Sequence, residues 1–266
     1  MSNRFYVVSY NRASESIKKN IIKELKAYNM DTDYIKGADY LIAVADREEV
    51  YDVCLKWFRQ NKPIIHLFAG EISCWATHDD VYRHSLTLMS DYQFCINSVA
   101  KDRVEKLCKA VNKQPHAFIV GNLYLDKLDI DCSEIPNEPY DLVLYNPPTR
   151  YSKEKVIEEC EEIYRVLKKG KRKYIWVSPN GDNFSDVIDK YTNEGNLPRP
   201  KYLGLLKKAN KFITNSSTQY FEAPYIMQKP NIISIGVRNR TRESRYTDTS
   251  KIGTTENFVK ILKVIE

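Results

Sequence analysis

The stretch Pro63-Ile64-Ile65-His66-Leu67-Phe68-Ala69-Gly70-Glu71 is a short apolar run that stops at a glycine and a carboxylate. Its length and its β-branched residues predict a buried strand. Apolar residues then recur with helical spacing over 79–90, and a second short apolar run follows at 92–97. The order strand, polar strand end, helix and strand is typical of parallel sheets covered by helices.

The same alternation continues along the chain in both directions from this stretch. It predicts strands at 5–9, 40–45, 63–68, 92–97, 117–120, 141–145, 174–178, 212–214 and 231–235. It predicts helices at 14–28, 48–60, 79–90, 99–111, 152–168, 184–191, 203–209, 218–227 and 255–265. A polar, proline-containing linker at 129–140 interrupts it. We therefore predict an α/β fold of two doubly wound, Rossmann-like parallel-sheet domains around a cleft, at 1–130 and 139–266.

The composition limits the classes of protein to which the chain can belong. The 266 residues are 42% hydrophobic and 12% aromatic, which is a folded composition. No window approaches the ~18 uninterrupted apolar residues that cross a membrane, and the first residues do not resemble a signal peptide. We therefore expect a cytoplasmic protein without a membrane partner. The six cysteines lack zinc-ligand spacing, so we expect reduced thiols.

The positive charge is concentrated in the second half of the chain. Residues 131–266 carry 23 Lys and Arg against 18 Asp and Glu, which gives +5 of the net +6. The excess forms three runs, 168–173, 207–211 and 238–245. Such runs fit either contact with a polyanion or ordinary solvated side chains.

Polar residues that follow the predicted strands are the first candidates for a site, because ligands of doubly wound folds bind at the carboxyl ends of the strands. In the first half these are Asp46, Glu71 and Asp79. A carboxylate cluster can combine a base with a proton donor, although each residue alone is also typical of a helix cap or an ion pair.

The second half offers hydroxyl groups at a predicted helix start. Asn215-Ser216-Ser217-Thr218 follows a strand, where backbone N–H groups and hydroxyls bind phosphate, or where Ser217 merely caps the helix. Glu222 lies about a turn further on. This carboxylate either accepts ribose hydroxyls or faces solvent.

Several of these pieces, in this order, resemble one known family. Ile64–Glu71 followed by Asp79–Ser90 resembles the "H-x-x-G-G-E … D-(D/E)-x-x-R-H-x-(I/L)-T-K-L" stretch of hydrolysing UDP-GlcNAc 2-epimerases. Val44-Ala45-Asp46-Arg47 is similar to the family's G-D-R strand end. Asn215–Glu222 and Ile235–Glu243 are similar to its nucleotide-binding segments. The resemblance covers about residues 40–245 and implies the GT-B fold.

The resemblance also implies a UDP-sugar site and assigns its residues. UDP would be held by Ser216, Ser217, Glu222 and Arg238, and its diphosphate would be reached by Arg12. The acid and base carboxylates at the sugar would be Asp46, Glu71 and Asp79. Because arginine and backbone N–H groups would offset the diphosphate charge, and no strand end carries an Asp-x-Asp pair, we expect no metal and no other cofactor.

Two departures from the family bear on the reaction. One strand–helix unit leads directly to the strand before Asp46, so we expect a reduced first domain. Asn146, in Leu144-Tyr145-Asn146-Pro147, stands where the epimerases have a histidine that serves elimination and UDP release. An amide hydrogen-bonds a phosphate but does not shuttle a proton. These changes leave UDP-sugar binding intact and put 2-epimerisation in question.

The leading hypothesis is therefore a UDP-sugar-dependent GT-B glycosyltransferase built on this scaffold. The reduced first domain and the basic, tyrosine-rich composition suggest a bulky acceptor. By analogy with the DNA glycosyltransferases of tailed phages, that acceptor would be a hydroxymethylated base in DNA, modified in the host cytoplasm. Two alternatives stay open: a hydrolysing UDP-GlcNAc 2-epimerase, and an inactive UDP-sugar or nucleic-acid binding module.

Overall fold

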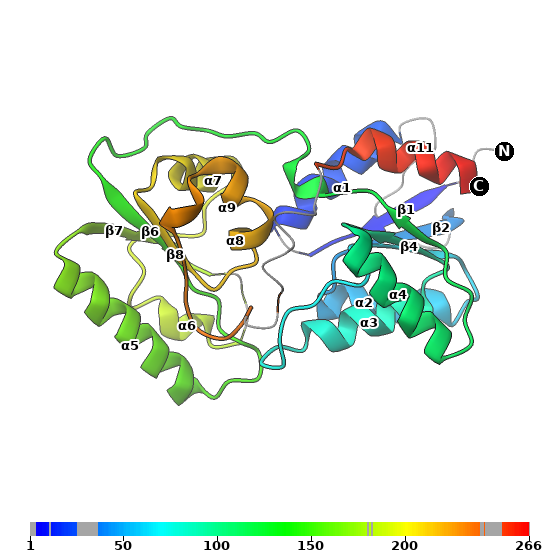
Figure 1. Cartoon of the computed structure of the whole chain (residues 1–266), viewed down its shortest axis with the longest axis horizontal. Helices are drawn as coiled ribbons and strands as arrows, with labels where there is room; N and C mark the ends of the chain where they lie inside the picture. The colour runs from blue at the N-terminus through cyan, green and yellow to red at the C-terminus, as the bar shows by residue number, and fades with distance from the viewer. Residues whose placement is uncertain are drawn as a thin grey trace. The chain divides into compact units, whose positions relative to one another are not determined.

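The computed structural model describes residues 4–10, 12–25, 37–179, 181, 183–239, 242 and 252–265. The contacts divide the chain into two compact units (Figure 1). The first unit comprises residues 1–72, 79–126 and 248–266, and the second unit comprises residues 73–78 and 127–247. Each unit contains one parallel sheet, as the alternating pattern predicts.

The sheet of the first unit has five parallel strands in the order β1-β2-β3-β4-β5. Its strands are β1 (Phe5–Val8), β2 (Tyr40–Val44), β3 (Ile64–Leu67), β4 (Tyr92–Cys95) and β5 (Ala117–Ile119). Its helices are α1 (Arg12–Glu24), α2 (Glu48–Phe58), α3 (Asp79–Met89), α4 (Ser98–Ala110), the 3-10 turn η3 (Leu123–Leu125) and α11 (Thr255–Ile265). One strand–helix unit precedes β2, in agreement with the expected reduced domain.

Helices cover both faces of this sheet. α2 packs against α3, and α3 against α4, on one face, while α1 and α11 pack together on the other (Figure 1). Every step from β1 to β5 runs in the same direction along the sheet, so α1 forms a crossover of opposite hand to the other three. Since right-handed crossovers are nearly universal, the β1-α1-β2 connection is the left-handed one.

The last helix belongs to the first unit, whereas the predicted range 139–266 assigned it to the second domain. Phe258 of α11 is fully buried and meets Phe94 edge-on with ring centroids 4.8 Å apart. The carboxylate of Asp126 accepts hydrogen bonds from the backbone N–H of Thr255, at 2.8 Å, and from its hydroxyl, at 2.5 Å. The apolar face of this helix was evident in the sequence, but its partner was not.

Segment 73–78 packs in the second unit, although it lies between elements of the first unit in sequence. The Thr149 hydroxyl accepts from the backbone N–H of His78 at 2.9 Å, and Arg242 donates to the Ser73 hydroxyl at 2.9 Å. The predicted range 1–130 did not anticipate this exchange.

The sheet of the second unit has the order β7-β6-β8-β9, all parallel. Its strands are β6 (Tyr140–Leu144), β7 (Lys173–Trp176), β8 (Lys211–Thr214) and β9 (Ile232–Ser234). Its helices are α5 (Lys153–Gly170), α6 (Ser185–Ile188), α7 (Arg199–Lys208), α8 (Thr218–Phe221), α9 (Ala223–Ile226) and the 3-10 turn η4 (Lys229–Asn231).

Residues of β6, and Tyr145 directly after it, alternate between two hydrophobic clusters. Leu142 and Leu144 join a cluster with Leu203 of α7, while Val143 and Tyr145 join one with Val156 of α5. Because strand side chains alternate between faces, α5 and α7 cover opposite faces of this sheet. Both predicted sheets are therefore doubly wound.

Two predictions of local structure are corrected. The predicted helix at 218–227 is instead the pair α8 and α9, broken at Glu222, whose φ is −127°. Pro224 explains the break, because its nitrogen has no hydrogen and its ring clashes with the carbonyl of a preceding helical turn. α7 starts at Arg199, earlier than predicted. Among the described helices, none is both long and apolar enough to cross a membrane.

Candidate active site

The predicted carboxylates of the first unit lie at the carboxyl ends of neighbouring strands. Asp46 follows β2, Glu71 follows β3, and Asp79 is the first residue of α3. β2 and β3 are paired in register up to Val44 and Leu67, so their ends lie at the same edge of the sheet. In doubly wound folds, ligands bind outside the carboxyl ends of the strands, which is the edge where these residues lie.

Arg83 of α3 contacts two of these residues, Asp46 and Glu71. Its guanidinium forms ion pairs with Asp46 and, at 2.5 Å, with Asp80, and it donates to the Glu71 carbonyl at 3.1 Å. Burial lowers the pKa of Arg83, but four carboxylates together hold it above its usual value: Asp46, Asp80, Asp79 and Glu71. Two carboxylates of the first unit, Asp46 and Asp80, therefore pair with one buried cation, and the charges of Asp79 and Glu71 also act on it.

The turn before Glu71 is held by close packing. Gly70 has φ +77°, and a Cβ at this position would lie 2.1 Å from the Ala100 carbonyl oxygen. Arg103 of α4 donates to the Gly70 carbonyl. Glu71 is 3% exposed, so this packing keeps a carboxylate within the protein interior.

Two histidines flank the Arg83 cluster. His66 of β3 is fully buried, with Nε2 3.2 Å from the Ala45 carbonyl and Nδ1 3.3 Å from the Thr87 hydroxyl. Burial is the main cause that lowers the pKa of His66 to about 3. Burial and then the charge of Arg83 lower the pKa of His84 to about 4. Both imidazoles are therefore neutral at pH 7.

In the second unit, Asn146 and Asn215 follow the two central strands. β6 connects to β7 on one side and is paired with β8 on the other, so the direction of the sheet reverses between β6 and β8. The Asn215 side chain accepts from the Asn146 N–H at 2.7 Å and donates to the Asn146 carbonyl at 2.8 Å. It thereby extends the ladder between these strands and fixes the Asn146 backbone at the expected place for a ligand.

Some of the polar groups around the loop Ser216-Ser217 form hydrogen bonds with one another. The N–H of Ser216 donates to the Thr214 hydroxyl at 2.9 Å, and the N–H of Thr218 donates to the Ser216 hydroxyl at 3.3 Å. Ser217 occupies the N-cap position of α8, yet its exposed side chain makes no capping hydrogen bond. The alternative that Ser217 serves as a helix cap is therefore wrong.

Glu222 is 4% exposed, so the alternative of a solvated helix residue is wrong as well. One of its oxygens, Oε1, lies 2.5 Å from Nη2 of Arg199, and the other, Oε2, accepts from the Thr218 hydroxyl at 3.2 Å. Arg199 is the first residue of α7. The carboxylate is thus held from two elements of the same unit.

Arginine side chains complete this region. Arg238 donates to the Pro147 carbonyl at 2.6 Å, and Asn239 donates to the Asn215 carbonyl. The guanidinium of Arg242, which is 7% exposed, lies 4.9 Å from the centre of the Phe221 ring. Arg12 opens α1 in the first unit, but its side chain lies outside the described residues, as do Arg240, Thr241, Glu243 and Arg245.

The structure thus separates the predicted residues into two sets. The first unit holds Asp46, Glu71 and Asp79, and Asp46 forms an ion pair with Arg83. The second unit holds Asn146, Ser216, Ser217, Glu222 and Arg238.

Sequence reasoning missed the contacts that hold both sets. Arg83 lies four residues after Asp79 on one helix face, a spacing that could have revealed it. Arg199 and Glu222 are 23 residues apart, and no local signal links them.

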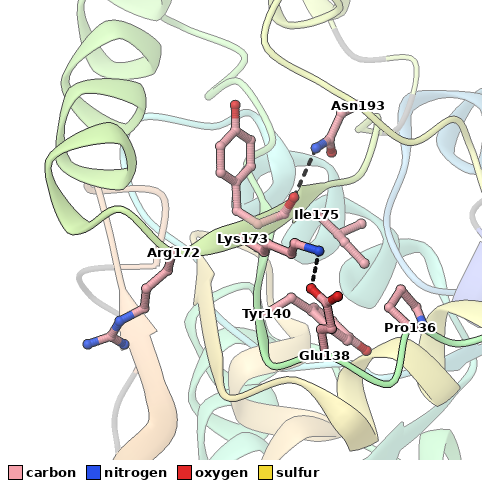
Figure 2. A pocket seen from close by; sticks show the side chains of 8 residues that line it. Pro136, Glu138, Tyr140, Arg172, Lys173, Ile175 and Asn193 are labelled. Atoms are coloured by element: carbon pink, nitrogen blue, oxygen red, sulfur yellow. Dashed lines mark hydrogen bonds and ion pairs between the residues drawn. The ribbon is translucent and has the colours of Figure 1, made fainter.

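A hollow of about 310 Å³ lies elsewhere, at the amino end of β7 in the second unit (Figure 2). Its lining includes Lys173, whose ammonium pairs with Glu138, and Asn193, which donates to the Tyr174 carbonyl. The basic runs at 168–173 and 207–211 lie at this end of the sheet. They are therefore at the opposite end from Asn146 and Asn215.

No three His, Cys, Asp or Glu side chains are grouped as metal ligands within the part of the chain that the structure describes. The thiols of Cys54, Cys95 and Cys160 are buried, and burial raises the pKa of each of them. These three cysteines are free and lie in the interior.

The chain is similar in sequence to sugar-nucleotide 2-epimerases of bacteria. The chain is 28% identical over 232 residues to the GDP/UDP-N,N'-diacetylbacillosamine 2-epimerase (hydrolyzing) of Campylobacter jejuni, which covers 77% of this chain and 58% of the relative. It is 24% identical over 226 residues to the UDP-N,N'-diacetylbacillosamine 2-epimerase (hydrolyzing) of Legionella pneumophila, with the same coverage, 77% and 58%. The chain therefore matches little more than half the length of these curated relatives.

Solved structures support the same fold. The UDP-N-acetylglucosamine 2-epimerase of Rickettsia bellii superposes with a TM-score of 0.63 at 14% identity, over 100% of this chain and 96% of that chain. The Methanocaldococcus jannaschii enzyme, in complex with UDP-GlcNAc and UDP, gives 0.58 at 15% identity, over 97% and 82%. At such identities the likeness shows the fold, which is GT-B as the resemblance implied.

The sequence profile of one family extends over nearly the whole chain. The profile described as UDP-N-acetylglucosamine 2-epimerase matches residues 9–266, which include every residue of both sets. The chain belongs to the UDP-N-acetylglucosamine 2-epimerase family.

Proposed function

We propose that the chain is a UDP-sugar 2-epimerase of the hydrolysing type. The observation that carries the proposal is buried Arg83, paired with Asp46 and bonded to the Glu71 carbonyl, with the charge of Asp79 acting on it, in a member of this family. A protein that only bound UDP would have no need of several carboxylates held at adjacent strand ends. The relatives named above are themselves 2-epimerases, which supports the same reaction class.

In this proposal the second unit binds the nucleotide. Ser216 and Ser217 offer hydroxyls and Arg238 offers a guanidinium, groups suited to a diphosphate. Asn146 offers an amide from a backbone that Asn215 fixes. Glu222 accepts hydrogen bonds from the ribose.

The first-unit carboxylates act on the sugar. One of them, as a base, removes the proton at C2 while the bond from C1 to the diphosphate oxygen breaks and its electron pair leaves with UDP. Water then supplies a hydroxyl to C1 and a proton to C2 from the opposite face. The balance is UDP-sugar plus water giving UDP plus the free 2-epimeric sugar. The charge of Arg83 offsets the negative charge that gathers among the carboxylates.

The transferase hypothesis has less support. The relatives and solved structures cited above are epimerases, and none of them is a DNA-modifying enzyme. Two of the three basic runs that suggested a DNA acceptor lie at the opposite end of the second sheet from the predicted nucleotide residues. The epimerase proposal and the transferase hypothesis predict different products, a free sugar in the first case and a sugar bonded to DNA in the second.

The test is incubation of the protein with a panel of UDP-sugars, with and without hydroxymethylcytosine DNA, followed by mass spectrometry. We expect free sugar and UDP in equal amounts without DNA, and the same rate in the presence of a chelator. A sugar adduct on the DNA, or a strict need for an acceptor, would overturn the proposal. UDP binding without turnover of any UDP-sugar would favour the binding module.

A further inference from the structure

The ion pair between Arg199 and Glu222 is the most enclosed pair of charges in the second unit among the described residues. The side chains are 12% and 5% exposed, and Nη2 of Arg199 lies 2.5 Å from Oε1 of Glu222. On the same helix, the pair of Lys201 with Glu134 is 35% and 79% exposed. A buried carboxylate is costly unless a partner compensates it, so Arg199 makes the interior position of Glu222 tolerable.

The second oxygen of Glu222 is tied to the loop proposed to hold the diphosphate. Thr218 donates its hydroxyl to Oε2 at 3.2 Å, and Ser216 in turn donates its hydroxyl to that of Thr218 at 3.3 Å. Arg199 on one side and this chain of hydroxyls on the other therefore fix the plane of the carboxylate.

These hydrogen bonds leave part of the hydrogen-bond acceptor capacity of the Glu222 carboxylate unused. Each carboxylate oxygen has two lone pairs, and one on each oxygen is used by Arg199 or Thr218. One acceptor site remains on each of the two oxygens of this carboxylate. Two adjacent acceptors match two neighbouring hydroxyls, such as the 2′ and 3′ hydroxyls of a ribose.

We infer that Arg199 is the positioning residue that gives this site its selectivity for ribonucleotides over 2′-deoxyribonucleotides. The inference rests on the proposed binding of UDP to the second unit. Arg199 does not touch the nucleotide in this account. It acts through Glu222, whose orientation decides whether the missing 2′ hydroxyl of a deoxynucleotide leaves an acceptor without a donor.

The test compares the affinities for UDP and 2′-deoxy-UDP by calorimetry. The unaltered protein should prefer UDP by at least about tenfold, the value of one hydrogen bond to a charged acceptor. Arg199→Met should bring the ratio to near one, and Arg199→Lys should restore part of it, because lysine keeps the charge without the planar fork. Lys201→Met, which removes the exposed pair of the same helix, should keep the full ratio.

The variant Glu222→Gln distinguishes a failure of the ribose contact from a failure of the role assigned to Arg199. If Glu222→Gln loses the preference and Arg199→Met keeps it, the ribose contact stands and the role of Arg199 is refuted. If the unaltered protein binds UDP without any preference, the inference and the ribose contact both fail, while the epimerase proposal is untouched. If it does not bind UDP at all, the proposed function fails too.

Loss of the buried charge partner could also prevent folding of Arg199→Met. The double variant Arg199→Met with Glu222→Gln removes the imbalance, and its ratio should equal that of Glu222→Gln alone. A double variant that still prefers UDP would overturn the inference.

Discussion

At the scale of single residues, the sequence predicted the kinds of side chain at the site better than their partners. Asp46, Glu71 and Asp79 follow strands or open a helix, which is a local signal, and the charges of all three act on one cation. The sequence did not name Arg83 as this cation, and it did not show that Glu222 is buried against Arg199. Both contacts depend on packing between elements that are distant in sequence. Burial of a charge is decided by such packing, so the sequence left the role of Glu222 open.

Asn146 gives a prediction about the reaction itself. It stands where the family resemblance leads one to expect a histidine, and its backbone is fixed by Asn215. We expect Asn146→His to raise kcat by roughly tenfold or more, because an imidazole can donate a proton to the leaving group and general acid catalysis is worth ~10²–10⁴. The measurement is UDP release from a UDP-sugar under saturating substrate. A variant that is no faster than the unaltered protein would show that the amide suffices for departure of UDP.

His66 gives a prediction about pH. Its pKa is lowered to about 3 by burial, from 6.5 in an unfolded chain, so the unfolded state takes up a proton that the folded state refuses. The stabilising contribution is complete above pH 6.5 and is lost as the pH falls toward 3. In urea titrations between pH 6 and pH 4, His66→Gln should reduce the pH slope of the unfolding free energy by up to about 1.4 kcal/mol per pH unit.

The matched control for His66 is the exposed His116 of the same unit. Carboxylates add to the slope equally in each protein, so the comparison isolates the imidazole. Equal slopes for His66→Gln and His116→Gln would contradict a neutral, buried His66.

At the scale of elements, the turns that carry the site were visible in the sequence, while the constraints on them were not. The glycine before Glu71 was evident, and a positive φ there is what glycine permits. Its contact with the Ala100 carbonyl at the start of α4 requires the packed structure. The split of the predicted helix 218–227 at Glu222 could have been inferred from Pro224.

Gly70→Ala tests this turn. The new Cβ would meet the Ala100 carbonyl oxygen at 2.1 Å in a left-handed conformation. We expect a loss of about 2 kcal/mol or more in unfolding free energy, measured by denaturant titration. Gly170 at the end of α5 is the control, because an added Cβ would meet nothing within 4 Å. Gly170→Ala should be neutral or stabilising by up to about 1 kcal/mol, and equal losses in both variants would argue against the strained turn.

The packing of α11 on the first unit makes another prediction. Phe258→Ala should destabilise that unit by about 3–5 kcal/mol, because it opens a cavity beside Phe94. Tryptophan fluorescence can be confined to the first unit by Trp75→Phe and Trp176→Phe, which leave buried Trp57 as reporter. Val264 of the same helix is 84% exposed, so Val264→Ala should change the midpoint of unfolding little. Similar midpoints for the two variants would contradict the assignment of α11 to this unit.

At the scale of the whole molecule, two sheets of parallel strands and their doubly wound character followed from the alternating pattern. The crossover of unusual hand around α1 did not. In a doubly wound sheet, strands before and after the switch point step in opposite directions, with helices on opposite faces. If the strands on one side of β1 are absent, α1 still lies on the sheet face that belongs to that side. The next strand, β2, then lies on the opposite side of β1, and the crossover through α1 is left-handed.

The assignment of α11 and of segment 73–78 also escaped prediction, for a common reason. Both depend on where a chain returns after leaving its own sheet, and an amphipathic pattern gives the buried face without naming its partner. The predicted carboxylates belong to the first unit and the predicted nucleotide-binding residues to the second.

The most direct test of the central claim, 2-epimerisation by the first-unit carboxylates, is proton exchange at C2. UDP-GlcNAc is incubated with the protein in deuterium oxide and the products are followed by NMR. The account predicts UDP and a free 2-epimeric sugar with deuterium at C2, formed ~10²–10⁴ times more slowly by Asp46→Asn and at the normal rate by the exposed control Asp102→Asn. Release of a sugar that keeps its original C2 hydrogen and configuration would contradict the account.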